Sequence, residues 1–253
     1  MAKPSGAPAP HGRRLVVAFV ALAACASAAS TPVPTLAPTP VPTAVPAPLA
    51  AADLVVAEHL IPWTPEREAL TETYLGLHRT TPLTGDSAAD TRMTPQVIVL
   101  HWTGGPTAAS AWATFAPDTL SGRPELLKGG TLNVGAHYVV ERDGRIERLF
   151  PEDRVVRHCI GLNHVAIGVE NVGGEPDLPL TDAQVEADAA LIRDIVRRQP
   201  VKWLYGHLES SAIEACPLYE EKDPTYRNAK PDPGAAFMAK VRAKVADLGL
   251  AGG

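Results

Sequence analysis

Residues 55–250 combine short apolar runs with longer stretches in which apolar residues recur three and four positions apart. The clearest apolar run is Val97-Ile98-Val99-Leu100, which ends on His101 and a Gly104-Gly105 turn. Four aliphatic residues without polar alternation predict a strand that is buried on both faces, as in a sheet covered by helices. Two later segments predict further strands, residues 165–172 and 201–205.

Amphipathic stretches between these runs predict helices. Thr64-Pro65 supplies an N-cap and a proline at the first helical position for a helix over about 65–79. Thr181 and Gln184 form a capping box ahead of an apolar stripe that Pro200 ends. The remaining predictions are a helix over 107–115, a last helix that Asp232 caps and Pro233 starts, and loops over 80–94 and 117–133.

Asp143-Gly144 separates two β-like segments, residues 134–141 and 145–150, and predicts a hairpin. Strands that alternate with helices, together with this hairpin, predict an α/β fold. We expect a mixed, mostly buried central sheet flanked by helices. No internal repeat is visible in the sequence.

The first 25 residues predict an exported protein. Lys3, Arg13 and Arg14 precede an apolar run over 15–24 that is too short to span a bilayer and matches a signal-peptide core. The four residues ending at Cys25 resemble the lipobox of bacterial lipoproteins, in which the cysteine is acylated. We therefore expect a lipoprotein-type signal peptide over 1–25 and a lipid anchor at Cys25, which would hold the protein to a membrane, facing the periplasm or cell wall. Simple cleavage within 26–28 is the alternative.

Residues 26–51 are rich in Pro, Thr and Ala, and we interpret them as a disordered linker. Alternating prolines over 30–50 disfavour helix and sheet alike. At roughly 3.1 Å per residue, a polyproline-like stalk of this length reaches about 60 Å. The folded domain is therefore expected over 52–250.

Charge argues against nucleic acid as a partner. Loss of residues 1–24 removes three of the 23 basic residues and no acidic one, which leaves 20 against 28 and a net charge near −8. No basic run remains. Cys159 and Cys216 are the cysteines of the folded part, and the sequence allows either a disulfide or two buried thiols.

Two of the predicted buried strands run into a histidine, His101 and His207. A carboxylate from the start of the last helix would complete a set of two nitrogens and one oxygen. This is a three-ligand arrangement that leaves zinc an open position. The ligands are distant in sequence, so their spacing alone does not establish a site.

Seven segments, in order, resemble the zinc N-acetylmuramoyl-L-alanine amidase family, whose fold is shared by bacterial cell-wall amidases, phage lysozyme-type amidases and peptidoglycan recognition proteins. They are residues 97–103, 133–140, 157–158, 161–164, 166–170, 206–207 and 230–234. The resemblance implies that the domain over 52–250 is an amidase domain. It also implies that peptidoglycan is its partner and that it cleaves the amide between the lactyl group of N-acetylmuramic acid and L-alanine.

The resemblance also implies roles for individual residues. His101, His207 and Asp232 would hold one Zn²⁺ ion. Glu170 would be the catalytic carboxylate, acting as general base toward water and then passing the proton to the leaving amine. Lys230 would be its cationic partner and would stabilise the oxyanion.

Two departures from the family pattern leave alternatives open. Phage-type relatives use a cysteine as the third ligand, so Cys216 competes with Asp232, and the segment 208–229 is longer than in many members. Phage-type enzymes also carry a catalytic tyrosine where this chain has Ala136. The other subgroup uses a glutamate, which Glu170 matches.

His158, Asn163 and Trp102 are expected to contact substrate, whereas His137 could equally be a core histidine or orient a ligand. A non-catalytic peptidoglycan-binding protein of the same fold is the alternative function. A zinc peptidase that acts within the stem peptide is a third.

Overall fold

A computed structural model describes residues 54–174, 176–227 and 229–253. The predicted signal peptide, Cys25 and the linker over 26–51 lie outside these residues. The helices are α1 (Pro65–His78), α2 (Ser87–Asp90), α3 (Ala108–Phe115), α4 (Pro124–Leu127), α5 (Asp182–Arg198), α6 (Ser210–Glu214) and α7 (Ala235–Lys244). The strands are β1 (Val56–Glu58), β2 (Val97–Trp102), β3 (Tyr138–Val140), β4 (Ile146–Arg148), β5 (Ala166–Asn171) and β6 (Trp203–Gly206).

The strands form one mixed sheet in the order β1-β4-β3-β5-β2-β6. Strands β3 and β4 pair antiparallel around the Asp143-Gly144 turn, and the other neighbouring strands pair parallel. The predicted α/β fold with a central mixed sheet is therefore confirmed. Across the described ranges, no helix has both the length and the apolar character needed to cross a membrane.

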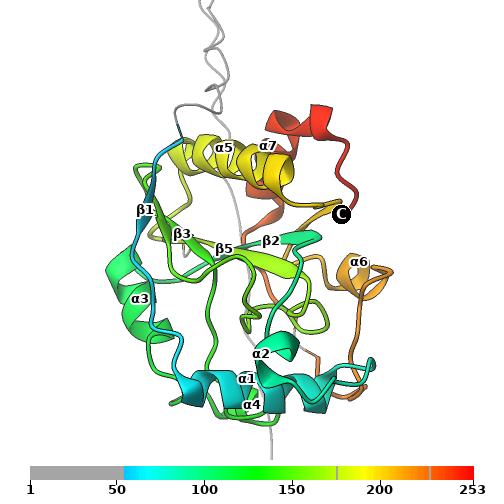
Figure 1. Cartoon of the computed structure of the whole chain (residues 1–253). Helices are drawn as coiled ribbons and strands as arrows, with labels where there is room; N and C mark the ends of the chain where they lie inside the picture. The colour runs from blue at the N-terminus through cyan, green and yellow to red at the C-terminus, as the bar shows by residue number, and fades with distance from the viewer. Residues whose placement is uncertain (1–53, 175, 228) are drawn as a thin grey trace, which may run out of the picture. The chain divides into compact units, whose positions relative to one another are not determined.

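Side chains of β2 alternate between two apolar layers. Ile98 and Leu100 pack with residues of α5 and α7, whereas Val97 and Val99 belong to a second cluster with Cys159 and Leu162. In Figure 1, α5 and α7 cover one face of the sheet, and α1, α2 and α4 lie beyond the other. Because alternate residues of a strand share a face, His101 follows Val97 and Val99 and points away from α5 and α7.

The strongly patterned elements were predicted correctly. Thr64 caps α1 and accepts from the Arg67 amide, and Thr181 forms the predicted capping box with Gln184 at the start of α5. The helix over 107–115 and the hairpin are also present. The prediction missed β1, α2, α4 and α6, which are three to five residues long. Elements this short contain too few residues for a periodic pattern to stand out.

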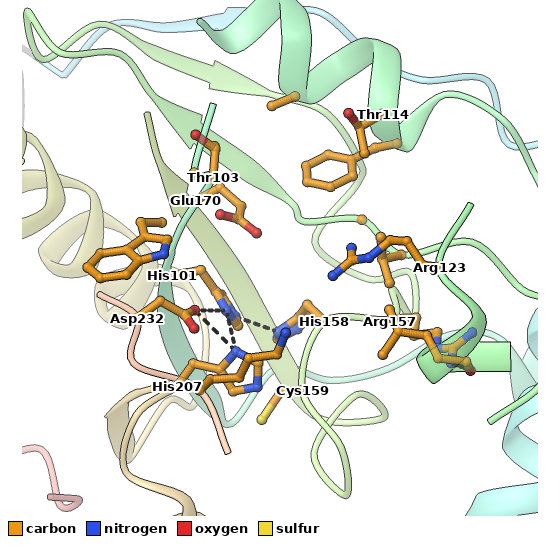
Figure 2. Close-up of a pocket in the computed structure, with 18 of the residues that line it drawn as sticks. His101, Thr103, Thr114, Arg123, Arg157, His158, Cys159, Glu170, His207 and Asp232 are labelled. Atoms are coloured by element: carbon orange, nitrogen blue, oxygen red, sulfur yellow. Dashed lines mark hydrogen bonds and ion pairs between the residues drawn. The ribbon is translucent and has the colours of Figure 1, made fainter. Parts of the chain in front are cut away.

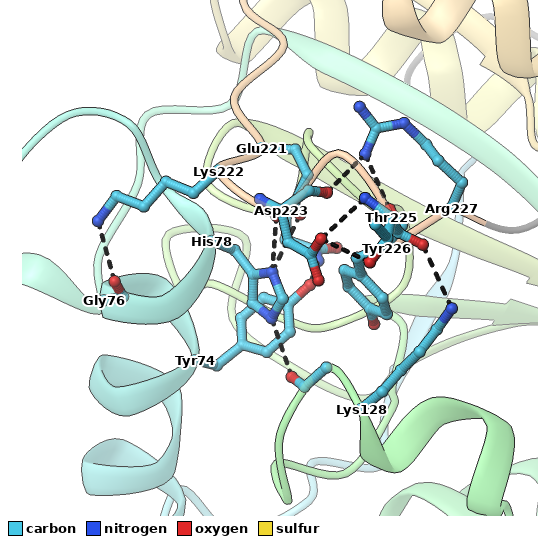
Figure 3. A network of polar contacts seen from close by, with 12 residues as sticks. Tyr74, Gly76, His78, Lys128, Glu221, Lys222, Asp223, Thr225, Tyr226 and Arg227 are labelled. Carbon is cyan, nitrogen blue, oxygen red and sulfur yellow. Dashed lines mark hydrogen bonds and ion pairs between the residues drawn. The ribbon is translucent and has the colours of Figure 1, made fainter.

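The long segment between His207 and Lys230 is anchored on α1 by polar contacts (Figure 3). The Nδ1 atom of His78 lies 2.9 Å from Oε1 of Glu221, and its Nε2 lies 3.0 Å from the carbonyl oxygen of Gly129. Lys222 donates from Nζ to the carbonyl oxygen of Gly76 at 3.0 Å. The contacts of Glu221 and Lys222 hold this segment against α1, and the contact with Gly129 joins α1 to the residues after α4. The chain then returns to the sheet edge that carries His207.

A buried polar pair lies between β5 and α5. Asn171 donates from Nδ2 to Oδ2 of Asp188 at 3.0 Å, and both side chains are fully buried. The other oxygens, Oδ1 of Asp188 and Oδ1 of Asn171, have no hydrogen-bond partner among the described residues. Burial raises the pKa of Asp188 to about 7, although the bond from Asn171 acts in the opposite direction. When Asp188 is protonated, its carboxyl group can donate a hydrogen bond, which the ionised carboxylate cannot do.

We expect Asp188 to make stability fall with rising pH. Its folded pKa lies above its ordinary value of 3.8, so the folded chain binds the extra proton, and that stabilisation is lost as pH rises from about 4 through 7. The slope is about 1.4 kcal/mol per pH unit in that window. Asp188→Asn should remove this slope and be more stable than the parent at pH 8, as measured by urea unfolding at pH 5.5 and 8. Asp177→Asn, at an exposed position, is the control, and equal slopes for Asp188→Asn and the parent would contradict the assignment.

Candidate metal centre

The register of three parallel strands sets polar residues side by side at one edge of the sheet. His101 of β2 pairs with Glu170 of β5, and Leu100 pairs with Gly206 of β6. His207 follows Gly206, and its amide donates to the carbonyl oxygen of Leu100 at 3.1 Å. Residues opposite each other in neighbouring strands share a face, so Glu170, His101 and His207 point to the same side. This edge is where the strands end, which is where α/β sheets place ligands.

Asp232 reaches the same place from the segment before α7. The sequence predicted that it would cap this helix, which is wrong: the N-cap is Gly234, and no side chain caps the helix. The physical reason is that the carboxylate turns instead to His101 and His207. The carbonyl oxygen of Asp232 accepts from the Leu208 amide at 2.7 Å, which ties its backbone to the residue after His207.

The three groups converge on a common point (Figure 2). Nδ1 of His101 lies 3.0 Å from Nδ1 of His207 and 3.1 Å from Oδ2 of Asp232. Nδ1 of His207 lies 3.2 Å from the same oxygen. Tetrahedral zinc, with bonds of about 2.0–2.1 Å, separates its ligand atoms by roughly 3.3–3.4 Å. Both the donor set and its spacing therefore fit one zinc ion.

Burial and the neighbouring ligand groups together shift the pKa values of His101 and Asp232. His101 is 2% exposed, and loss of hydration lowers its pKa to about 4, although Asp232 acts in the opposite direction. Desolvation works against ionised Asp232, but the two neighbouring histidines outweigh that effect and lower its pKa. Neutral imidazole and ionised carboxylate are the forms that bind metal, so the site favours binding at neutral pH.

Glu170 lies beside the triangle, paired in register with His101. Its Oε2 atom is buried and has no hydrogen-bond partner among the described residues. Burial and the charge of Asp232 raise its pKa well above the ordinary value, while Arg123 and Lys230 act to lower it. An unpartnered carboxylate with a raised pKa beside a ligand set has the properties of a general base that is waiting for water or substrate.

A cleft of about 500 Å³ opens in front of these groups. Trp102 and Lys230 line it, as does Arg123, which precedes α4. An added Cβ on Gly174 would lie 2.2 Å from the Trp102 ring, so this glycine allows the indole to pack against the 174 loop. The sequence does not identify Arg123, because this residue lies in the predicted loop over 117–133 and belongs to no motif.

The predicted substrate residues His158 and Asn163 line the same cleft, but both bond within the protein. The Oδ1 atom of Asn163 accepts from the amides of His158 and Cys159 at 2.8 and 2.7 Å, and its Nδ2 donates to the hydroxyl of Tyr74. His158 bonds to His101. A direct contact of either residue with substrate stays a prediction.

His137 and Cys216 lie away from the ligand set. His137 is completely buried, its Nδ1 accepts from the Gly168 amide at 3.0 Å, and its Nε2 faces the carbonyl oxygen of Arg154. It is therefore a core histidine. Cys159 and Cys216 are both buried free thiols, so the disulfide alternative is not present. Among the described residues, the group that could hold a metal contains Asp232 and not Cys216.

Comparison with known proteins identifies the family to which this chain belongs. Residues 91–235 match the family model described as N-acetylmuramoyl-L-alanine amidase. Endolysins of Klebsiella phage KP32 and Escherichia phage T7 are 33% and 35% identical over 98 residues, covering 37% of this chain and 64% of each relative. The match thus spans just under two thirds of these relatives. The amidase LysC from Clostridium intestinale URNW is a structural neighbour, with a TM-score of 0.46 and 21% identity over 76% of this chain and 98% of that one.

Metal content should distinguish Asp232 from Cys216 as the third ligand. We expect the purified chain to hold about one equivalent of zinc by elemental analysis. Asp232→Ala should lose most of it, because two histidines alone bind zinc weakly. Cys216→Ser, which alters a buried thiol outside the triangle, should keep it. The opposite result in the two variants would transfer the ligand role to Cys216.

Proposed function

Because the chain belongs to the N-acetylmuramoyl-L-alanine amidase family, we propose that it is a zinc-dependent amide hydrolase of peptidoglycan. The bond cut is the amide between the lactyl group of N-acetylmuramic acid and L-alanine of the stem peptide. The observation that carries the proposal is the triangle of His101, His207 and Asp232 beside the unpartnered carboxylate of Glu170. A protein that only binds peptidoglycan has no chemical need for that pairing.

An amide is a poor electrophile, so its hydrolysis needs both an activated nucleophile and a polarised carbonyl. Zinc held by His101, His207 and Asp232 supplies both, as a Lewis acid that also lowers the pKa of water. Glu170 acts as general base: its carboxylate takes the proton of the attacking water and later delivers it to the nitrogen of the leaving L-alanine. The raised pKa of Glu170 helps it to retain the proton between these two steps.

Cationic groups complete the cleft. Lys230 and Arg123 both line it and both act to lower the pKa of Glu170, which favours the ionised base. The charge of Asp232 raises the pKa of Glu170, and this effect is neutralised when the carboxylate of Asp232 holds a cation. Lys230 also offers an ammonium to the oxyanion that develops on the attacked carbonyl, an interaction worth on the order of 3 kcal/mol. Trp102 provides an apolar wall for the substrate.

The proposed location is the cell envelope. It is supported by the basic and apolar leader over 1–25, the lipobox-like cysteine Cys25 and the proline-rich stretch that follows. A lipid on Cys25 would hold the chain at a membrane, and a stalk of about 60 Å would let the domain reach the wall.

Glu170→Gln tests the catalytic proposal. The substitution keeps the shape of the side chain but removes the base, so we expect zinc content to stay unchanged and hydrolysis of muropeptides to fall by about 10²–10⁴-fold. Activity is measured by mass spectrometry of products, which should show new L-alanine amino termini and free lactyl carboxylates.

Glu186→Gln, an exposed glutamate on α5 beyond the opposite face of the sheet, is the matched control and should retain full activity. A zinc-loaded parent protein that binds muropeptides without cleaving them would identify a sensor instead. Products cut within the stem peptide would identify a peptidase.

A further inference from the structure

Both ring nitrogens of His158 bond within the protein. Its Nε2 lies 3.0 Å from the carbonyl oxygen of Ala166, and its Nδ1 lies 3.1 Å from Nε2 of His101. The two rings stand nearly perpendicular, at 88°, with centroids 5.2 Å apart. His158 therefore contacts the edge of the His101 ring opposite Nδ1, the nitrogen that faces His207 and Asp232 (Figure 2).

The direction of these bonds determines where each proton lies. A carbonyl oxygen only accepts, so Nε2 of His158 must donate to Ala166. The neutral ring then has a lone pair on Nδ1, which accepts from the Nε2 proton of His101. His101 is consequently left with a bare Nδ1. If the His101–His158 bond ran the other way, Nδ1 of His101 would carry the proton in the neutral ring and could not bind a metal.

The surrounding structure is shaped to hold His158 in this position. Gly168 lies within β5, and a Cβ at this position would come within 2.8–2.9 Å of three atoms of the His158 ring. Glycine weakens a strand interior and often marks a close approach, here the approach of the imidazole. The backbone of His158 is held independently by Asn163, whose Oδ1 accepts from the His158 amide.

We propose that His158 is a positioning residue for the metal centre, which holds His101 with Nε2 protonated and Nδ1 free for zinc, and that substrate contact is not its role. This inference rests on the zinc site of the proposed function and adds to it a residue outside the ligand set. It also explains why Ala166, Gly168 and Glu170 lie on one strand: the first orients His158, the second makes room for it, and the third lies beside His101.

Zinc affinity of the full chain, measured by competition with a chromophoric chelator in the absence of substrate, tests the proposal. His158→Leu removes the acceptor for His101 and should weaken zinc binding by about 10–100-fold. His158→Asn places an amide oxygen near the position of Nδ1 and should recover most of the affinity. The cobalt-substituted protein should show the same order, with a visible absorption spectrum that changes in the Leu variant and returns toward the parent in the Asn variant.

His137→Asn is the matched control, because it alters a neighbouring buried histidine whose ring lies 5.9 Å from that of His158 and has no bond to His101. Its zinc affinity should stay within about twofold of the parent. Zinc affinity of His158→Leu equal to the parent would overturn the proposal, as would a raised KM for muropeptides with unchanged zinc affinity.

Thermal melting of the metal-free variants reports whether they fold. If His158→Leu does not fold, Gly168→Ala replaces it, since the added methyl group would displace the His158 ring and should also weaken zinc binding. Unchanged affinity in that variant would equally overturn the proposal. A parent protein that binds zinc but does not cleave muropeptides would refute the proposed function alone, because the affinities are compared without substrate.

Discussion

The site depends on the parallel register of β5, β2 and β6. Hydrogen bonding between the backbones sets Glu170 beside His101 and brings His207 to the next strand edge. A shift of one residue in either pairing would turn a side chain to the opposite face, toward α5 and α7. The apolar residues that precede these three groups therefore have a functional consequence, because their burial in two separate layers prevents such a shift.

Some polar groups around the site form hydrogen bonds within the protein, whereas others are left without a partner. Arg157, although it lines the cleft, donates to carbonyl oxygens of Gly130, Leu132 and Leu126 and so holds the segment that forms the wall of the cleft. Asn163 has its amide occupied in the same way. Buried polar groups are normally satisfied like this. Among the described residues that line the cleft, Glu170 alone has a buried side-chain oxygen without a hydrogen-bond partner.

Much of the fold and of the site could be predicted from local patterns. Three local patterns predict elements that are present in the structure. They are the apolar run before His101, the capping box at Thr181 and the Asp143-Gly144 turn. The positions of His158 and Asn163 in the cleft could be inferred from motif resemblance, but their bonding could not. A hydrogen bond between His101 and His158 depends on how two distant loops and strands pack, and neither residue shows that partner in its own neighbourhood.

By itself the sequence determined the strands, the principal helices, and the residue types that the chemistry requires, because these follow from periodicity, capping and motif spacing over a few residues. The tertiary structure alone decided that Asp232 faces the histidines instead of capping α7, and that Cys159 and Cys216 remain thiols. It also decided that His158 contacts His101. The physical reason is that each of these outcomes is a competition between partners distant along the chain, and only the packed sheet with its loops sets the distances that decide it.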